Sequence, residues 1–121
     1  MFVEVRVLCG SEQEADVISR IAVEGRLAAY AHTYMVKSHY RWEGKLVTCE
    51  ETVLELGTVS ERVDAIRMMV KENHSYEVPS FTVSELHNVE HDYATWLRNN
   101  STEPIVHWRY QPKYNLRDDE Y

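Results

Sequence analysis

Three short segments of this 121-residue chain hold the side chains best suited to chemistry. The run YRWEGKL (residues 40–46) sets aromatic rings beside paired charges, and NHSYEVP (73–79) adds imidazole, phenol and carboxylate groups. A third run, EHDY (90–93), repeats that mixture. Convergent rings and polar groups of this kind suit the binding of a small ligand or a cation. We therefore expect function to gather near the first run.

Gly44 predicts that the first run is the tip of a hairpin. A tight hairpin turn demands positive φ, which glycine adopts without a Cβ clash. Aromatic and β-branched residues on either side, from Leu27 to about Leu56, predict two strands longer than is usual in a small domain. The tip should project beyond the core. The simpler alternative is that Trp42 and Lys45 merely cover the strand ends.

The segment before the hairpin predicts a strand followed by a helix. Hydrophobic residues alternate with charged ones from Val3 to Val7, the pattern of a strand with one buried face. Ser11 and Glu14 then have capping-box spacing, which predicts a helix start. Apolar residues recur at helical intervals until the helix ends near Gly25.

The segment after the hairpin predicts a second helix, a strand and a further helix. Thr58 and Glu61 have capping-box spacing, and the helical pattern that follows breaks at Asn73. Phe81 begins a short alternating run that predicts a strand. Residues 91–98 then carry rings at i and i+3 spacing, which predicts a helix with an aromatic face.

This order of elements predicts an α+β, ferredoxin-like fold. It is βαββαβ with an added C-terminal helix, the split βαβ arrangement in which two helices cover one face of four antiparallel strands. One open sheet face and a long hairpin would remain, and both need a partner.

Charge and composition exclude several functional classes. Twenty acidic and thirteen basic residues give a net charge of −7, which disfavours nucleic acid as a partner. No apolar run approaches the roughly 20 residues that span a bilayer, and no basic region precedes a long apolar stretch, so we expect a cytoplasmic protein without membrane association. The spacing of Cys9 and Cys49 indicates neither a disulfide framework nor a zinc knuckle.

Several motifs in a fixed order resemble the CutA family. YRWEGKL, HSYEVP and DYATWL correspond to that family's hairpin, turn and terminal helix, and VLCGSEQEA and GRLAAYA match its first strand, helix start and turn. The resemblance runs from about Phe2 to Arg98. It implies a CutA-like domain over residues 1–98.

The resemblance also implies a homotrimer in which each hairpin extends a neighbour's sheet and hides edge strands. A cleft between the subunits would then bind a small ligand or a cation. The residues expected to converge there are Tyr40, Trp42, Glu43, Lys45, Glu50, Tyr76 and Glu90.

The family's association with divalent-cation tolerance implies a metal site. Bacterial members are described as binding copper through a cysteine and histidines, which match Cys9 and His74 here. Asn73 replaces the first of two adjacent histidines. Thiolate and imidazole suit Cu²⁺ or another divalent cation, and no organic cofactor is implied. The alternatives are that Cys9 is a small buried hydrophobe and that His74 ends a helix, where a protonated ring is favoured by the helix dipole.

Other positions depart from the family. Leu56 stands where many members have a lysine, which changes the charge available to an anion. Tyr30 replaces a cysteine of the family's turn. Residues 99–121 form an extension containing Trp108 and Tyr110, and we expect it to dock on the domain or on a neighbouring subunit. The alternative is an extension that simply thickens the trimer.

Two functions from different classes remain open. The first is a metal-ion-responsive trimer that binds copper or another divalent cation. The second is a PII-like signalling trimer that binds a small metabolite or a partner protein in its intersubunit clefts. We do not expect an enzyme, because the sequence carries no nucleophile elbow, phosphate loop or paired metal-protease histidines.

Overall fold

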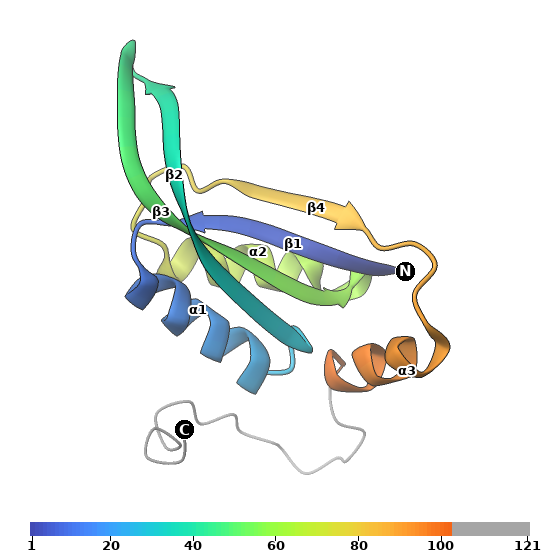
Figure 1. The fold of residues 1–121 in the computed structure, drawn as a ribbon. Coiled ribbons are helices and arrows are strands. Elements are labelled where there is room, and N and C mark those ends of the chain that lie inside the picture. Colours follow the sequence, from blue (N-terminus) through green and yellow to red (C-terminus); the bar gives the residue numbers. More distant parts are fainter. Residues whose placement is uncertain (103–121) are drawn as a thin grey trace.

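A computed structural model describes residues 1–102 of the chain. It confirms the expected α+β, ferredoxin-like fold with an added terminal helix (Figure 1). A short 3₁₀ turn lies between the third strand and the second helix. The elements are β1 (Phe2–Cys9), α1 (Glu12–Glu24), β2 (Tyr30–Trp42), β3 (Lys45–Val59), α2 (Val63–Asn73), β4 (Phe81–Glu85) and α3 (His91–Asn100).

The four strands form one antiparallel sheet in the order β2-β3-β1-β4. Helices α1 and α2 lie along one side of it (Figure 1). Because side chains alternate across a strand, Val5 and Val7 of β1 share their face with their partners Leu56 and Leu54 of β3. All four are fully buried, and Ile18 of α1 joins them in the core. The hydrophobic residues that alternate along β1 in the sequence are thus the ones that face the helices.

Helix α1 begins at the expected cap, with one change of partner. Ser11 Oγ accepts the backbone N–H of Glu14 at 3.1 Å, as a capping box requires. The Glu14 carboxylate accepts the N–H of Gly10 at 2.8 Å, one residue before the cap. Gly25 ends the helix with φ −82°, and the next residue, Arg26, takes the left-handed conformation at φ 59°.

The prediction that Thr58 caps the second helix was wrong. Thr58 is a fully buried residue of β3, paired with Val3, and its hydroxyl donates to the carbonyl of Leu27 at 2.7 Å. A β-branched side chain with a buried acceptor is better satisfied in the strand than at a cap. Helix α2 instead begins at Val63, and its last residue is Asn73, where the sequence pattern breaks.

The hairpin projects beyond the rest of the sheet, as the sequence predicts (Figure 1). Glu43 and Gly44 both have positive φ, at 50° and 81°, which is the geometry of a tight two-residue turn. Strand β1 pairs with β3 only as far as Thr52, so residues 37–50 form a two-stranded ribbon, here called the arm. Leu46 and Trp42 on the arm are 69% and 47% exposed.

Helix α3 lies near the start of β1 (Figure 1). The Arg98 guanidinium is 5.1 Å from the centre of the Phe2 ring, and Leu97 is fully buried. The helix continues to Asn100, two residues past the domain boundary expected from the sequence. The expected docking of the extension concerns mainly residues 103–121, which lie outside the described part of the chain.

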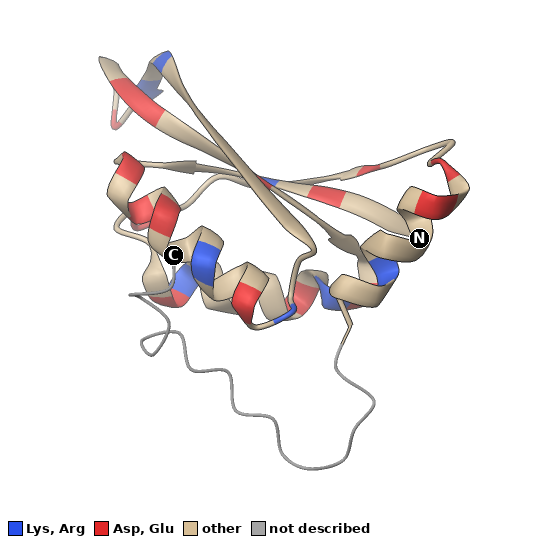
Figure 2. Ribbon diagram, turned by 60° about the horizontal axis from the view of Figure 1, so that its bottom comes forward, with Lys and Arg blue, Asp and Glu red and all other residues tan. Residues whose placement is uncertain are grey.

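Charged residues are mixed over the described surface. Lys and Arg positions are scattered over the helices and the arm among Asp and Glu positions, without one continuous basic stripe along residues 1–102 (Figure 2). Within the same residues, no helix is long and apolar enough to cross a membrane.

Candidate functional site

Two features adjoin the end of β1. The first, the metal-ligand cluster, consists of Cys9, Glu14 and His74. The second, the hairpin pocket, is lined by Leu8, Ser38, His39, Tyr40, Trp42, Glu51, Tyr76, Glu77, Val78 and Ser80.

The metal-ligand cluster joins three elements. Cys9 is the last residue of β1, Glu14 lies in the first turn of α1, and His74 follows the last residue of α2. Their potential ligand atoms, a sulfur, a carboxylate oxygen and an imidazole nitrogen, all lie within 4.8 Å of one another. The structure therefore brings together the two expected ligands, Cys9 and His74, and adds Glu14, for which the sequence suggested only a capping role.

Cys9 is held as a neutral thiol. Its side chain is fully buried. Burial raises the pKa of the thiol from 9.0 to about 12, and the nearby carboxylates of Glu14 and Glu51 add to the rise. At neutral pH the sulfur is thus a protonated small hydrophobe, which is the alternative expected for this residue in the absence of a metal.

Both ring nitrogens of His74 are engaged in hydrogen bonds. Nε2 lies 2.7 Å from the carbonyl oxygen of Leu8, and Nδ1 lies 3.0 Å from the backbone nitrogen of Tyr76. A carbonyl can only accept and an amide N–H can only donate, so the proton belongs on Nε2 and the lone pair on Nδ1. The ring is neutral in this arrangement, which argues against the protonated helix-end alternative.

Glu14 fastens α1 to the loop that follows α2. Its carboxylate accepts hydrogen bonds from Gly10 N–H, from the backbone N–H of Ser75 and, at 3.1 Å, from the Ser75 hydroxyl. Burial alone would raise the pKa of this carboxyl, but these hydrogen bonds outweigh burial and lower it. Glu14 Oε2 is 3.7 Å from His74 Nδ1. The ionised carboxylate thus faces the lone pair of the imidazole.

The donor types of the cluster fit a divalent cation of borderline softness. Thiolate, imidazole and carboxylate together suit Cu²⁺ or Zn²⁺ better than a hard ion such as Mg²⁺. Binding must remove the Cys9 proton and compete with the Tyr76 N–H for His74 Nδ1. Asn73 adds no donor, because its amide turns back to the carbonyl of Met69 at 2.8 Å. These interactions predict a modest affinity that rises with pH.

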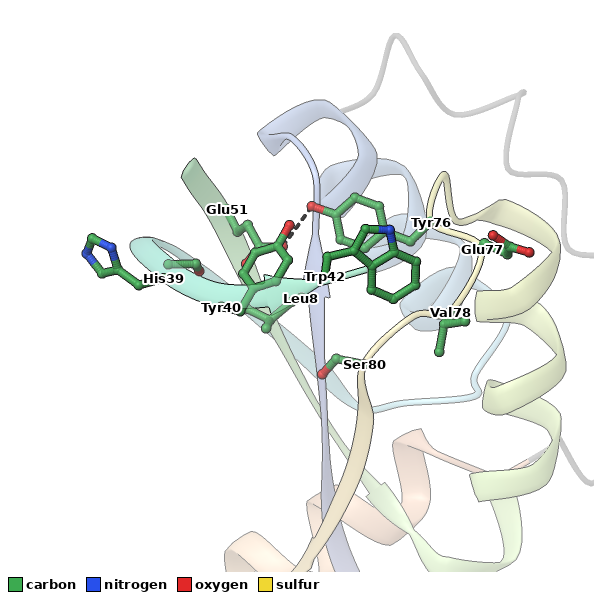
Figure 3. A pocket seen from close by; sticks show the side chains of 10 residues that line it. Leu8, His39, Tyr40, Trp42, Glu51, Tyr76, Glu77, Val78 and Ser80 are labelled. Carbon is green, nitrogen blue, oxygen red and sulfur yellow. Dashed lines mark hydrogen bonds between the residues drawn. The ribbon is translucent and has the colours of Figure 1, made fainter. Parts of the chain in front are cut away.

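The hairpin pocket lies where the arm leaves the sheet. Its volume is about 590 Å³, within the range of small-molecule sites. The rings of Tyr40 and Trp42 come from β2, and the ring of Tyr76 comes from the loop after α2 (Figure 3). The imidazole of His39 points away from these rings, and its Nδ1 lies 3.0 Å from Thr48 Oγ1 (Figure 3).

A buried carboxylate forms part of the pocket wall. Glu51 is only 4% exposed, and its Oε2 accepts the hydroxyl of Tyr76 at 2.7 Å (Figure 3). Burial and this hydrogen bond to Glu51 both raise the pKa of Tyr76. The neighbouring Tyr76 N–H bonds His74, so a single loop residue contacts both the pocket acid and the metal-ligand cluster.

The structure gathers only some of the expected cleft residues within one chain. Tyr40, Trp42 and Tyr76 line the pocket, whereas Glu43 lies at the arm tip and Lys45 pairs with Trp42 beside it. Two other expected residues lie elsewhere.

Glu50 is exposed and pairs with Lys37, while the adjacent Glu51 lines the pocket. Glu90 precedes α3 and is exposed. The alternation of β3 could have favoured Glu51 over Glu50 as a cleft residue. Side chains alternate across a strand, so Glu51 shares a face with Val53 and Glu55, and Glu50 lies on the opposite face.

The fold defines a class of small ferredoxin-like proteins with a long projecting arm, and in this chain a thiol, a carboxylate and an imidazole meet at the end of β1. The family described as CutA1 divalent ion tolerance protein matches residues 3–100. The chain belongs to this family.

Relatives and solved structures agree. The chain is 32% identical over 98 residues to the divalent-cation tolerance protein CutA of Thermus thermophilus, a match that covers 80% of this chain and 95% of the relative. It is 32% identical over 93 residues to protein CutA of Homo sapiens, covering 76% of this chain and 52% of the human protein.

Among solved structures, the periplasmic divalent cation tolerance protein CutA of Archaeoglobus fulgidus superposes with a TM-score of 0.82 at 26% identity. The Cut A1 structure from Thermus thermophilus superposes with 0.81 at 31% identity. Each match covers 84% of this chain and the whole of the other chain.

Proposed function

We propose that this chain acts in the response to divalent metal ions as a homotrimeric binding protein, and that it binds Cu²⁺ or another divalent cation at the metal-ligand cluster. The observation that carries the proposal is the convergence of Cys9, Glu14 and His74, whose donor atoms lie within 4.8 Å of one another. Its relatives in Thermus thermophilus and Thermotoga maritima are named divalent-cation tolerance proteins, which supports the same role.

The residues of the cluster have separate tasks in this proposal. The bound cation would supply positive charge that favours the Cys9 thiolate. Glu14 is already ionised and fixed by Gly10 and Ser75, so it holds negative charge ready beside the site. His74 is oriented by its Nε2–H bond to Leu8, which directs Nδ1 toward Glu14. The role is binding rather than catalysis.

A copper titration tests the proposed ligands. The full chain should bind one Cu²⁺ per subunit. The affinity for Cu²⁺ should fall at least about tenfold in Cys9→Ala and in His74→Ala, because each substitution removes a proposed direct ligand of the ion. Cys49→Ala and His87→Ala are matched controls that remove the same groups from outside the cluster and should titrate like the wild type. Unchanged titration curves for Cys9→Ala and His74→Ala, in folded proteins, would reject these ligands.

The arm supports a homotrimer. It exposes Leu46, and an isolated two-stranded ribbon is only marginally stable in water. Strand β2 is also an edge of the sheet over residues 30–42, so its outer backbone groups are available to a second copy. Three arms that each extend a neighbour's sheet would stabilise the ribbon and pair the free edge of β2.

The cytoplasm is the proposed compartment. Both Cys9 and Cys49 are free thiols, which suits a reducing environment. Fractionation of cells that express the chain, with a cytoplasmic and an exported marker, tests this part of the proposal. Recovery with the exported marker would contradict it.

The hairpin pocket supports a second candidate, a binding trimer that takes a small ligand. A cavity of about 590 Å³ walled by three aromatic rings and a buried acid is more than a packing defect. The two candidates are compatible, because the cluster and the pocket use different side chains. They are separated by titrating metals and small molecules independently.

A further inference from the structure

We propose that the hairpin pocket binds a small organic cation, an amine or a quaternary ammonium group, against the rings of Tyr40, Trp42 and Tyr76. This inference rests on the second candidate above, ligand binding in the pocket, and names the chemical class of that ligand. It does not depend on whether the metal-ligand cluster binds an ion.

The aromatic walls provide the first reason. Tyr40 and Trp42 project from β2 on the same face of the strand, and Tyr76 approaches from the loop after α2 (Figure 3). Ring faces attract cations through their quadrupole, and several rings around one cavity form a cage for a quaternary ammonium group. Trp42 is 47% exposed and Tyr40 is 38% exposed, so neither ring is buried in the core of its own chain.

The charge of the pocket provides the second reason. Glu51 is 4% exposed and Glu77 contributes a further carboxylate, while the described residues that line the pocket include neither Lys nor Arg. A carboxylate offers about four lone-pair positions, and the Tyr76 hydroxyl occupies one of them. A buried negative charge without a cation beside it in the pocket wall attracts a positive ligand and repels phosphate or carboxylate groups.

The balance of the lining separates an organic cation from a metal ion. A hard metal ion needs six or so oxygen ligands, and a soft one needs thiolates or imidazoles. The pocket instead offers mainly rings and apolar groups such as Leu8 and Val78, and the His39 ring points away from it. A bulky and weakly hydrated ammonium group matches this surface better than a strongly hydrated ion does.

The test compares choline with its uncharged isostere 3,3-dimethylbutan-1-ol by calorimetric titration of the full chain. Choline should bind at least about tenfold more tightly, because the two differ mainly in charge. Glu51→Gln keeps an acceptor for Tyr76 and removes the charge, so it should weaken choline binding by a similar factor. The matched control is Glu50→Gln, which removes an exposed carboxylate from the adjacent position of β3 and should change affinity less than about twofold.

A second variant covers the aromatic wall. Trp42→Leu removes a half-exposed ring outside the core and should reduce the preference for choline over the alcohol. Circular dichroism verifies that each variant is folded. Equal affinity for choline and the alcohol, or equal affinity of Glu51→Gln and Glu50→Gln for choline, would overturn the proposal.

An anionic probe distinguishes the two levels of failure. If phenylacetate binds and choline does not, the pocket takes small ligands and the proposed ligand class is wrong. If neither choline nor phenylacetate nor the alcohol binds, both the ligand class and the second candidate function are rejected.

Discussion

At the residue scale, Cys9 and His74 are held neutral by different means. The Cys9 thiol is neutral because burial and two carboxylates disfavour the thiolate. The His74 ring is neutral because an amide N–H and a carbonyl dictate its tautomer. A cation at this cluster must therefore replace interactions that already exist, which makes its binding dependent on pH.

The buried thiol predicts that stability falls at alkaline pH. The thiol pKa is 9.0 in the unfolded chain and about 12 in the folded one, so between these values the unfolded state has lost a proton that the folded state keeps. The unfolded state then binds fewer protons, and the free energy of unfolding decreases as pH rises, by at most about 1.4 kcal/mol per pH unit for one group. This stability is fully present below pH 9 and is lost on approach to pH 12.

Urea unfolding in the presence of a chelator measures this slope. The useful window lies between about pH 8 and the ordinary tyrosine pKa of 10.0, because Tyr30 and Tyr76 also have raised pKa values and contribute above it. Cys9→Ala should flatten the slope, and Cys49→Ala should leave it unchanged. A slope that persists in Cys9→Ala would show that another group is responsible.

Motifs in the sequence predicted Cys9, His74, Tyr40, Trp42 and Tyr76 as site residues, but they did not predict the acids that the structure places beside them. Glu14 has capping-box spacing, yet its side chain reaches Gly10 and Ser75 instead of the cap. That choice depends on where the loop after α2 lies, and no local pattern specifies it. Such contacts between segments far apart in the chain could not be predicted from the sequence.

At the element scale, the strands were predictable because one face of each is buried. The alternation along β1 and the turn at Gly44 are local and strong signals. The start of α2 was missed because Thr58 and Glu61 satisfy the spacing rule for a cap while Thr58 is held in β3 by Leu27. Tertiary hydrogen bonding outweighed a local propensity there.

Gly57 of β3 and Tyr30 of β2 form a pair in which the glycine leaves room for a ring. They are register partners, and a Cβ on Gly57 would overlap the Tyr30 ring. The Tyr30 hydroxyl in turn donates to Glu4 at 2.7 Å. Tyr30 therefore depends on Gly57 for its position.

Gly57→Ala should lower the free energy of unfolding by about 1–3 kcal/mol, the usual cost of overpacking a tight site. A double-mutant cycle supplies the control: in a Tyr30→Ala background the same change should cost less than about 1 kcal/mol, because the ring is gone. Chemical unfolding of the four proteins gives the coupling. Additive effects would contradict the account of this pair.

At the scale of the whole molecule, the arm and the exposed edge of β2 argue for assembly. Native mass spectrometry should give three times the 14.3 kDa chain mass. Leu46→Asp puts a charge on the most exposed hydrophobic side chain of the arm and should favour the monomer. Met68→Asp alters a similarly exposed residue of α2, 64% against 69%, and should leave the trimer intact. A wild type that stays monomeric at micromolar concentration would contradict the proposed assembly.

The most direct test of the proposed function is a crystal structure of the copper-soaked full chain with anomalous scattering recorded at the copper edge. We predict a peak within bonding distance of Cys9 Sγ, a Glu14 carboxylate oxygen and His74 Nδ1, with the Tyr76 N–H displaced from the imidazole. A fully soaked crystal that has its copper peaks only on surface histidines, with the His74 to Tyr76 hydrogen bond intact, would contradict it.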